Sequence, residues 1–158
     1  MEKKDLDWGN IGFSYMPTDK RYVANYKDGA WDGGAMTSDP NVVINECAGI
    51  LQYCQEIFEG LKAYTTEDGS IVTFRPDLNA ERMMDSARRL EMPPFPKERF
   101  LEAVDQVVKA NAAWVPPFGS GATLYLRPYM FASGPVIGVK PSQEYQFRLF
   151  GTPVGPYF

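Results

Sequence analysis

The chain has 158 residues, of which 44% are hydrophobic, and its 16 basic and 20 acidic side chains give a formal net charge of −4. This length and this apolar content are typical of one globular domain with a substantial core, and they argue against a disordered chain. Acids and bases are intermixed and no long apolar run occurs, so the sequence predicts no nucleic-acid surface and no membrane span.

The sequence contains no histidine, and its two cysteines are Cys47 and Cys54. A Ser-His-Asp or Cys-His nucleophile therefore cannot be assembled from these residues, and no zinc-ligand spacing is present. Phosphate-binding motifs of the Gly-Lys-Ser/Thr and Gly-x-Gly-x-x-Gly types are also missing. The start of the chain is charged and lacks the apolar core of a secretion signal. We expect reduced, partly buried cysteines in a cytoplasmic protein without a metal site.

The first third of the chain predicts short extended elements. Residues 1–20 form an irregular lead-in, and residues 22–26 follow as a strand. Lys27, Asp28 and Gly29 predict the turn of a hairpin. Residues 42–44 are apolar and predict a short strand or an extended piece, and residues 48–56 are expected to form a short helical turn.

The stretch from Leu51 to Pro93 organises the rest of the chain. It predicts two strands joined by a tight turn at residues 66–69, followed two or three residues later by a helix. Asp68 and Gly69 are expected to supply the positive φ angles that such a hairpin turn needs.

Two helices follow from apolar residues that recur every three or four positions. The first is predicted from about Leu78 to Leu90, with Asp77 as its N-cap. The second is predicted from about Lys97 to Asn111. The residues expected on the two buried faces are Met83, Ala87, Leu90, Phe100, Val104, Val107 and Val108.

The last third predicts two strands, at residues 123–130 and 145–153, because apolar and polar residues alternate there. The loop between them carries an apolar centre at Val136–Val139, and residues 152–158 are apolar and aromatic. Both features lie where solvent-exposed polar residues are usual, so we expect a neighbouring structure to cover them. Hairpins with two main helices predict an α+β domain with a largely antiparallel sheet.

Four segments occur in the order and at the separations found in the amino-terminal half of branched-chain aminotransferases, which are pyridoxal-phosphate enzymes of fold type IV. The segments are FEGLKAY at 58–64, FRPDLNAERMMDSARRLEMP at 74–93, LYLRP at 124–128 and PVGPYF at 153–158. The chain resembles this family from about Tyr22 to its last residue. The resemblance implies that residues 21–158 form the small domain, and that a large domain bearing the cofactor-holding lysine lies outside this chain. No catalytic residue is then expected within it.

The resemblance also implies roles for individual residues. Arg82 matches the arginine that binds the cofactor phosphate, for which a planar guanidinium is well suited. The alternative is an ordinary solvated helix arginine. Phe58 matches an aromatic residue of the substrate pocket, and Tyr53 matches a tyrosine that reaches the site of the neighbouring subunit. Each of these two could instead be a plain core or interface aromatic residue.

Tyr125 and Arg127 match a pair on the substrate side, and residues two apart on a strand share a face. The resemblance implies that Arg127 helps to bind the side-chain carboxylate of glutamate or 2-oxoglutarate. An arginine in an apolar strand needs a partner, so the alternative is a buried salt bridge to Glu59 or Asp85.

Val139 matches a loop valine that crosses the dimer interface, and Tyr157 matches an aromatic residue near the domain junction. Lys62 and Lys140 match no cofactor-holding position. A histidine that often precedes the Tyr53 position in the family is replaced here by Gln52.

Taken together, the resemblance implies a homodimeric transaminase that exchanges the amino group of leucine, isoleucine or valine with 2-oxoglutarate through pyridoxal phosphate. This chain alone would be inactive. Two alternatives keep the fold, namely a D-amino-acid transaminase and an aminodeoxychorismate lyase. A third, from another class, is a non-catalytic dimerisation domain.

Overall fold

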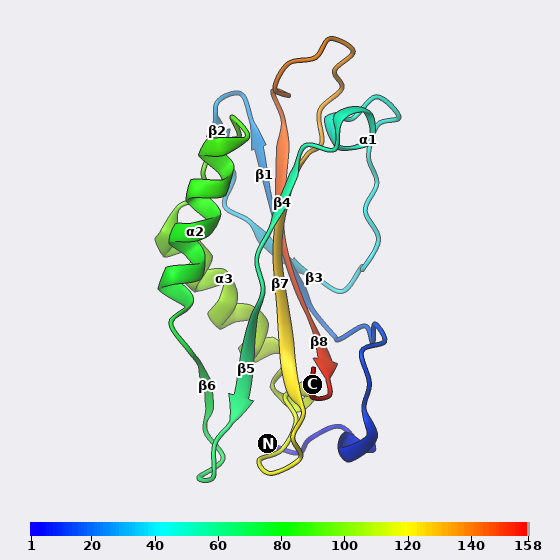
Figure 1. Cartoon of the computed structure of the whole chain (residues 1–158), viewed down its shortest axis with the longest axis vertical. Coiled ribbons are helices and arrows are strands. Elements are labelled where there is room, and N and C mark those ends of the chain that lie inside the picture. The colour runs from blue at the N-terminus through cyan, green and yellow to red at the C-terminus, as the bar shows by residue number, and fades with distance from the viewer. Residues whose placement is uncertain (158) are drawn as a thin grey trace.

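A twisted antiparallel sheet with two long helices on one face makes up most of the computed structural model, which describes residues 1–157 (Figure 1). Within these residues the sheet has eight strands in the order β2-β1-β8-β7-β5-β6, with β3 beside β1 and β4 beside β7. Every pairing between them is antiparallel. The α+β class with a largely antiparallel sheet, predicted from the sequence, is confirmed.

Helices and strands are mixed along the chain, and the two long helices lie between the sixth and the seventh strand. The strands are β1 (Arg21–Lys27), β2 (Ala30–Trp31), β3 (Ala35–Thr37), β4 (Glu56–Phe58), β5 (Leu61–Thr65), β6 (Ile71–Thr73), β7 (Thr123–Ala132) and β8 (Tyr145–Val154). The α-helices are α1 (Gly49–Tyr53), α2 (Pro76–Arg89) and α3 (Lys97–Ala110), and single 3₁₀ turns lie at Trp8–Asn10 and Ala112–Trp114. No helix within residues 1–157 is long and apolar enough to cross a membrane.

Strands β7 and β8 form the centre of the sheet and pair along their whole ten-residue lengths. Their alternate side chains on the helix-covered face are fully buried, namely Leu124, Leu126, Met130, Phe147 and Leu149. Because neighbouring residues of a strand point to opposite faces, Tyr125, Arg127 and Tyr129 lie on the open face, where they are only partly buried. The sheet therefore has one packed face and one face available for binding.

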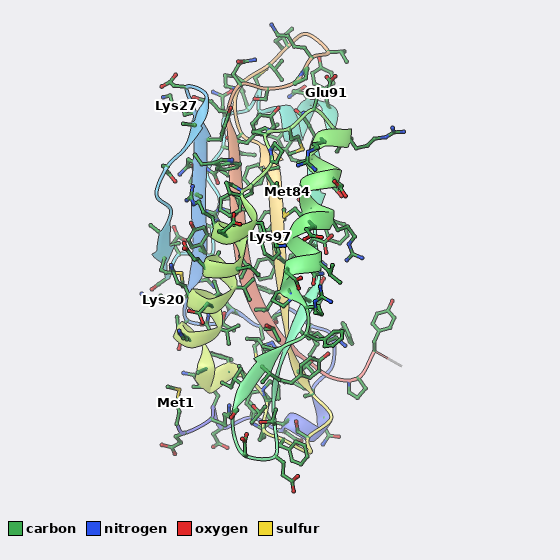
Figure 2. The ribbon with its side chains drawn as sticks, turned by 90° about the vertical axis from the view of Figure 1, so that its left-hand side faces the viewer. Met1, Lys20, Lys27, Met84, Glu91 and Lys97 are labelled. Atoms are coloured by element: carbon green, nitrogen blue, oxygen red, sulfur yellow. The ribbon has the colours of Figure 1, made fainter. Side chains whose placement is uncertain are left out.

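Helices α2 and α3 lie side by side over the packed face, as Figure 2 shows with Met84 on α2 and Lys97 at the start of α3. Their buried residues are Ala80, Met83, Ala87, Phe100, Ala103, Val104 and Val107, which confirms the predicted buried stripes except at Leu90 and Val108. Between the helices, Phe95 stacks on Phe147 with ring centroids 3.8 Å apart and planes 7° from parallel. This aromatic stack fills the space between the helix layer and the centre of the sheet.

The first turn of α2 differs from the prediction. The N-cap is Arg75, in a left-handed conformation with φ 47°, and no side chain caps the helix there. Asp77 was predicted as the N-cap, but Pro76 already occupies the first helical position, so Asp77 lies inside the helix. The Asp77 carboxylate instead accepts hydrogen bonds from Arg75 Nε at 2.9 Å and Arg75 Nη2 at 2.7 Å.

This pair makes the start of α2 sensitive to acid. The hydrogen bonds from Arg75 lower the pKa of Asp77 from 3.8 to about 2. Because the pKa is lower in the folded state, the pair stabilises the fold above about pH 4, and this contribution is lost as the pH falls towards about 2. We expect an NMR titration to give a midpoint near 2 for Asp77, and Arg75→Ala to return it to about 3.9. A midpoint near 4 in the unmodified protein would contradict the pairing.

The two predicted hairpin turns are present. Asp28 and Gly29 both have positive φ angles, of 52° and 81°, between β1 and β2. In the turn between β5 and β6, Gly69 has φ 86°, but Asp68 does not adopt a positive φ, contrary to the prediction. The Asp68 carboxylate accepts a hydrogen bond from the Ser70 N–H at 2.9 Å instead, which holds the turn without a left-handed aspartate.

The region before β4 tests three expectations. Of the two alternatives predicted for residues 42–44, the short strand is not formed, and these residues lie in the connection before α1. The helical turn expected within residues 48–56 is confirmed as α1. Both cysteines are free, and Cys47 is partly buried as predicted. Cys54, predicted to be partly buried, is exposed; it is the C-cap of α1 and has a left-handed backbone conformation with φ 54°.

Candidate functional site

The site is built around the three consecutive residues Phe58, Glu59 and Gly60, where β4 ends and β5 has not yet begun. The Glu59 N–H donates to the carbonyl of Pro128 at 2.8 Å, so this segment stays attached to the middle of β7. The Phe58 side chain lies on the open face and is 60% exposed, whereas Glu59 is buried on the helix side. The segment therefore presents different side chains to the two faces of the sheet.

On the helix side, Glu59 binds Arg82 of α2 through both carboxylate oxygens. Arg82 Nε lies 2.7 Å from Oε1 and Arg82 Nη2 lies 2.7 Å from Oε2. The Glu59 side chain is only 3% exposed, but the Arg82 side chain is 68% exposed. The hydrogen bonds and the charge of Glu59 raise the pKa of Arg82 above its usual value.

The Arg82 guanidinium keeps most of its hydrogen-bonding capacity. An arginine has five N–H donors, and the pair with Glu59 uses two of them, so about three remain. These remaining donors belong to an exposed guanidinium whose orientation is fixed by its two hydrogen bonds to Glu59. Such a group can bind a phosphate or another planar or tetrahedral anion.

On the open face, Arg127 lies between two aromatic rings. Its guanidinium carbon is 4.5 Å from the ring centroid of Phe58 and 5.3 Å from that of Tyr125, and its Nε donates to Tyr125 Oη at 3.1 Å. A Cβ atom at Gly60 would lie 2.5 Å from Tyr125 Oη, so only glycine leaves room for this tyrosine.

The alternative salt bridge of Arg127 is not formed within residues 1–157. Glu59 pairs with Arg82 instead, and Asp85 pairs with Arg88 at 2.8 Å. Arg127 is thus a cation held by aromatic rings and a hydroxyl group, without a carboxylate partner in the described part of the chain. A partly buried cation in this state is suited to an anionic ligand.

Tyr53 and Val139 lie together at another place, at the end of the molecule where α1 meets the loop between β7 and β8 (Figure 1). They line a cavity of about 310 Å³, and the Tyr53 hydroxyl donates to the carbonyl of Ile137. Val139 is 88% exposed. These two residues therefore form an exposed tip, separate from the cluster around Arg127.

Tyr157 lies apart from both groups. Its ring packs edge-on against Phe13, with centroids 5.3 Å apart, so the end of the described chain contacts the lead-in. The structure thus brings together three of the seven residues singled out from the sequence, namely Phe58, Tyr125 and Arg127, and places Arg82 on the other side of the same segment. Within residues 1–157 no cluster of metal-ligating side chains is found.

Sequence reasoning missed two residues of this site. Glu59 was considered only as a partner of Arg127, and it serves Arg82 instead. Asn79 was not considered, yet its Nδ2 donates to Glu59 Oε2 at 2.9 Å and to the carbonyl of Gly60 at 3.2 Å. The signal available in the sequence was the position of Glu59, a carboxylate between Phe58 and Gly60 in an otherwise apolar stretch, which indicates a buried charge that needs a partner.

Comparison with known proteins places this geometry in context. No family model matches the chain. A branched-chain-amino-acid aminotransferase of Haemophilus influenzae is 55% identical over 98% of this chain and 45% of that protein, and one of Helicobacter pylori is 47% identical over 98% of the chain and 46% of the protein. The chain thus spans a little under half the length of these curated relatives.

Solved structures agree on the fold. The branched-chain aminotransferase of Thermoproteus uzoniensis, solved with norvaline, superposes with a TM-score of 0.70 at 23% identity, over 89% of this chain and 42% of that one. The enzyme of Escherichia coli superposes with a TM-score of 0.69 at 22% identity, over 89% and 41%. The fold is that of a small domain of an aminotransferase. By sequence, the chain belongs to the branched-chain aminotransferases and corresponds to their amino-terminal small domain.

Proposed function

We propose that this chain is part of an enzyme that exchanges the amino group of leucine, isoleucine or valine with 2-oxoglutarate in a ping-pong cycle. The observation that carries the proposal is the meeting of two cationic groups at one segment. Arg82 lies on its helix side, and Arg127 lies with Phe58 on its open side. The identities of 55% and 47% with two branched-chain aminotransferases support this choice of reaction.

Pyridoxal phosphate is the proposed cofactor, and Arg82 fits its phosphate because the exposed guanidinium has N–H donors to spare. A third branched-chain aminotransferase, which superposes with a TM-score of 0.58, was solved with pyridoxamine 5'-phosphate. When bound, the cofactor supplies the electron sink for amino-group exchange. We assign the lysine that holds it to a large domain following residues 21–158.

Arg127 is proposed to bind the side-chain carboxylate of glutamate or 2-oxoglutarate. Its guanidinium contacts the Phe58 and Tyr125 rings and donates to the Tyr125 hydroxyl, and these contacts restrict its orientation. Phe58 would supply an apolar wall for a branched side chain. Tyr157 would lie near the junction with the large domain.

The proposed assembly is a homodimer in the cytoplasm. The exposed tip with Tyr53 and Val139 lies away from the Arg127 cluster, so it is suited to reach the site of a second subunit. The two free cysteines are consistent with a reducing compartment.

The test is the visible absorption spectrum of the full-length gene product that contains this chain. We expect a yellow band that bleaches with leucine and returns with 2-oxoglutarate. Bleaching with D-alanine alone would move the assignment to D-amino-acid transaminases, and conversion of aminodeoxychorismate without either response would indicate the lyase. A protein that gains no band with added pyridoxal phosphate would leave a non-catalytic dimerisation domain.

A substitution at Gly60 separates the substrate side of the site from the cofactor side. In Gly60→Ala, the new methyl group displaces the Tyr125 hydroxyl and with it the hydrogen bond to Arg127. We expect kcat/KM for 2-oxoglutarate to fall about tenfold, the loss that one misplaced hydrogen bond produces. Gly33→Ala is the matched control, because a Cβ atom there meets nothing within 4 Å. Equal rates for the two variants would contradict this role.

A further inference from the structure

Glu59 is a nearly buried carboxylate whose side-chain contacts come from one face of α2. Asn79 and Arg82 lie three residues apart on that helix, so they share a face and reach Glu59 together. Glu59 Oε2 accepts from both of them and Oε1 accepts from Arg82 alone. The carboxylate is therefore held in one orientation by three hydrogen bonds.

This arrangement restricts the arginine more than it restricts the glutamate. An exposed arginine normally samples many rotamers, and this conformational freedom must be lost when it binds a ligand. Arg82 is 68% exposed, yet its Nε and Nη2 are both fixed at 2.7 Å from a carboxylate that is itself buried. Its remaining donors consequently point in a set direction before any ligand arrives.

We propose that Glu59 is a positioning residue that orients Arg82 for a phosphate dianion, with Asn79 holding Glu59 in turn. The inference rests on the proposed function, because it takes the cofactor phosphate as the anion. The carboxylate also repels a phosphate through its charge. Its contribution is thus one of orientation, and this preorganisation outweighs the repulsion.

The test compares two cofactors that differ only in the phosphate, pyridoxal phosphate and pyridoxal, on the full-length gene product freed of cofactor. The dissociation constant of pyridoxal divided by that of pyridoxal phosphate measures what the phosphate contributes to binding, and a smaller ratio means a smaller contribution. In Glu59→Gln, the amide nitrogen faces the Arg82 donors and the paired contact is broken. We expect the advantage of the phosphorylated cofactor to fall about tenfold or more, as for other residues that orient a ligand-binding group. The dissociation constant of this variant for pyridoxal should stay within about twofold of that of the unmodified protein.

Three further variants make the result specific. Glu56→Gln, at an exposed position of the adjacent strand, should leave the ratio unchanged. Asn79→Ala should lower the ratio while keeping the charge of Glu59, and it replaces Glu59→Gln if that variant does not fold. In an Arg82→Ala background, Glu59→Gln should have no further effect on the ratio, because Glu59 acts through Arg82.

Other outcomes overturn the inference. Equal losses for both cofactors would show that Glu59 only supports the fold, and a larger phosphate contribution in Glu59→Gln would show that repulsion dominates. If the unmodified protein binds neither cofactor, the proposed function itself fails. If it binds both with equal affinity, the cofactor assignment stands and the phosphate role of Arg82 and Glu59 fails.

Discussion

Replacing Arg82 with alanine is expected to weaken the binding of pyridoxal phosphate at least about 100-fold. Two charge-assisted hydrogen bonds to the phosphate would be lost, each worth about 1.5–3 kcal/mol. The substitution also leaves Glu59, 3% exposed, with Asn79 as its remaining side-chain partner. We therefore expect a second effect, a loss of about 1–3 kcal/mol in the free energy of unfolding.

Spectrophotometric titration of the cofactor-free protein measures the first effect and urea unfolding measures the second. Arg88→Ala is the matched control, because Arg88 lies on the same helix and pairs with the exposed Asp85. We expect it to change neither quantity measurably, as surface ion pairs contribute little. Unchanged affinity for pyridoxal phosphate in Arg82→Ala would refute the phosphate role.

Replacing Phe147 with alanine is expected to lower the free energy of unfolding by about 3–5 kcal/mol. The ring is fully buried and stacked on Phe95 at 3.8 Å, and the rings of Tyr22 and Phe100 lie 6.0 Å away. Its removal leaves a cavity where β8 meets the helix layer, and the surrounding rings belong to three different parts of the fold that cannot collapse together.

Thermal or urea unfolding of the unmodified protein and of two variants tests this expectation. Phe74→Ala removes the same number of atoms from a side chain that is 81% exposed, and we expect it to cost less than about 0.5 kcal/mol. A similar loss in both variants would mean that the Phe95–Phe147 stack is not the centre of the core.

Local patterns were sufficient for much of the fold. The buried stripes of α2 and α3 and the alternation along β7 and β8 follow from side-chain direction, which depends only on the local backbone. The hairpin turn at Asp28 and Gly29 is equally local, because the conformational freedom of those residues selects it. The family, too, was readable from four segments of the sequence, and with it the candidate residues of the site.

Contacts between distant residues were decided only by the tertiary structure. Whether residues 42–44 pair with a strand and how far Cys54 is exposed depend on which parts of the fold lie next to them. The same holds for the partners of the two arginines. Glu59 lies 23 positions before Arg82 and was considered in the sequence only as an alternative partner of Arg127, but in the structure its carboxylate binds Arg82 of α2. Charge alone does not decide which of the two arginines pairs with Glu59. The direction in which each side chain leaves the backbone decides it.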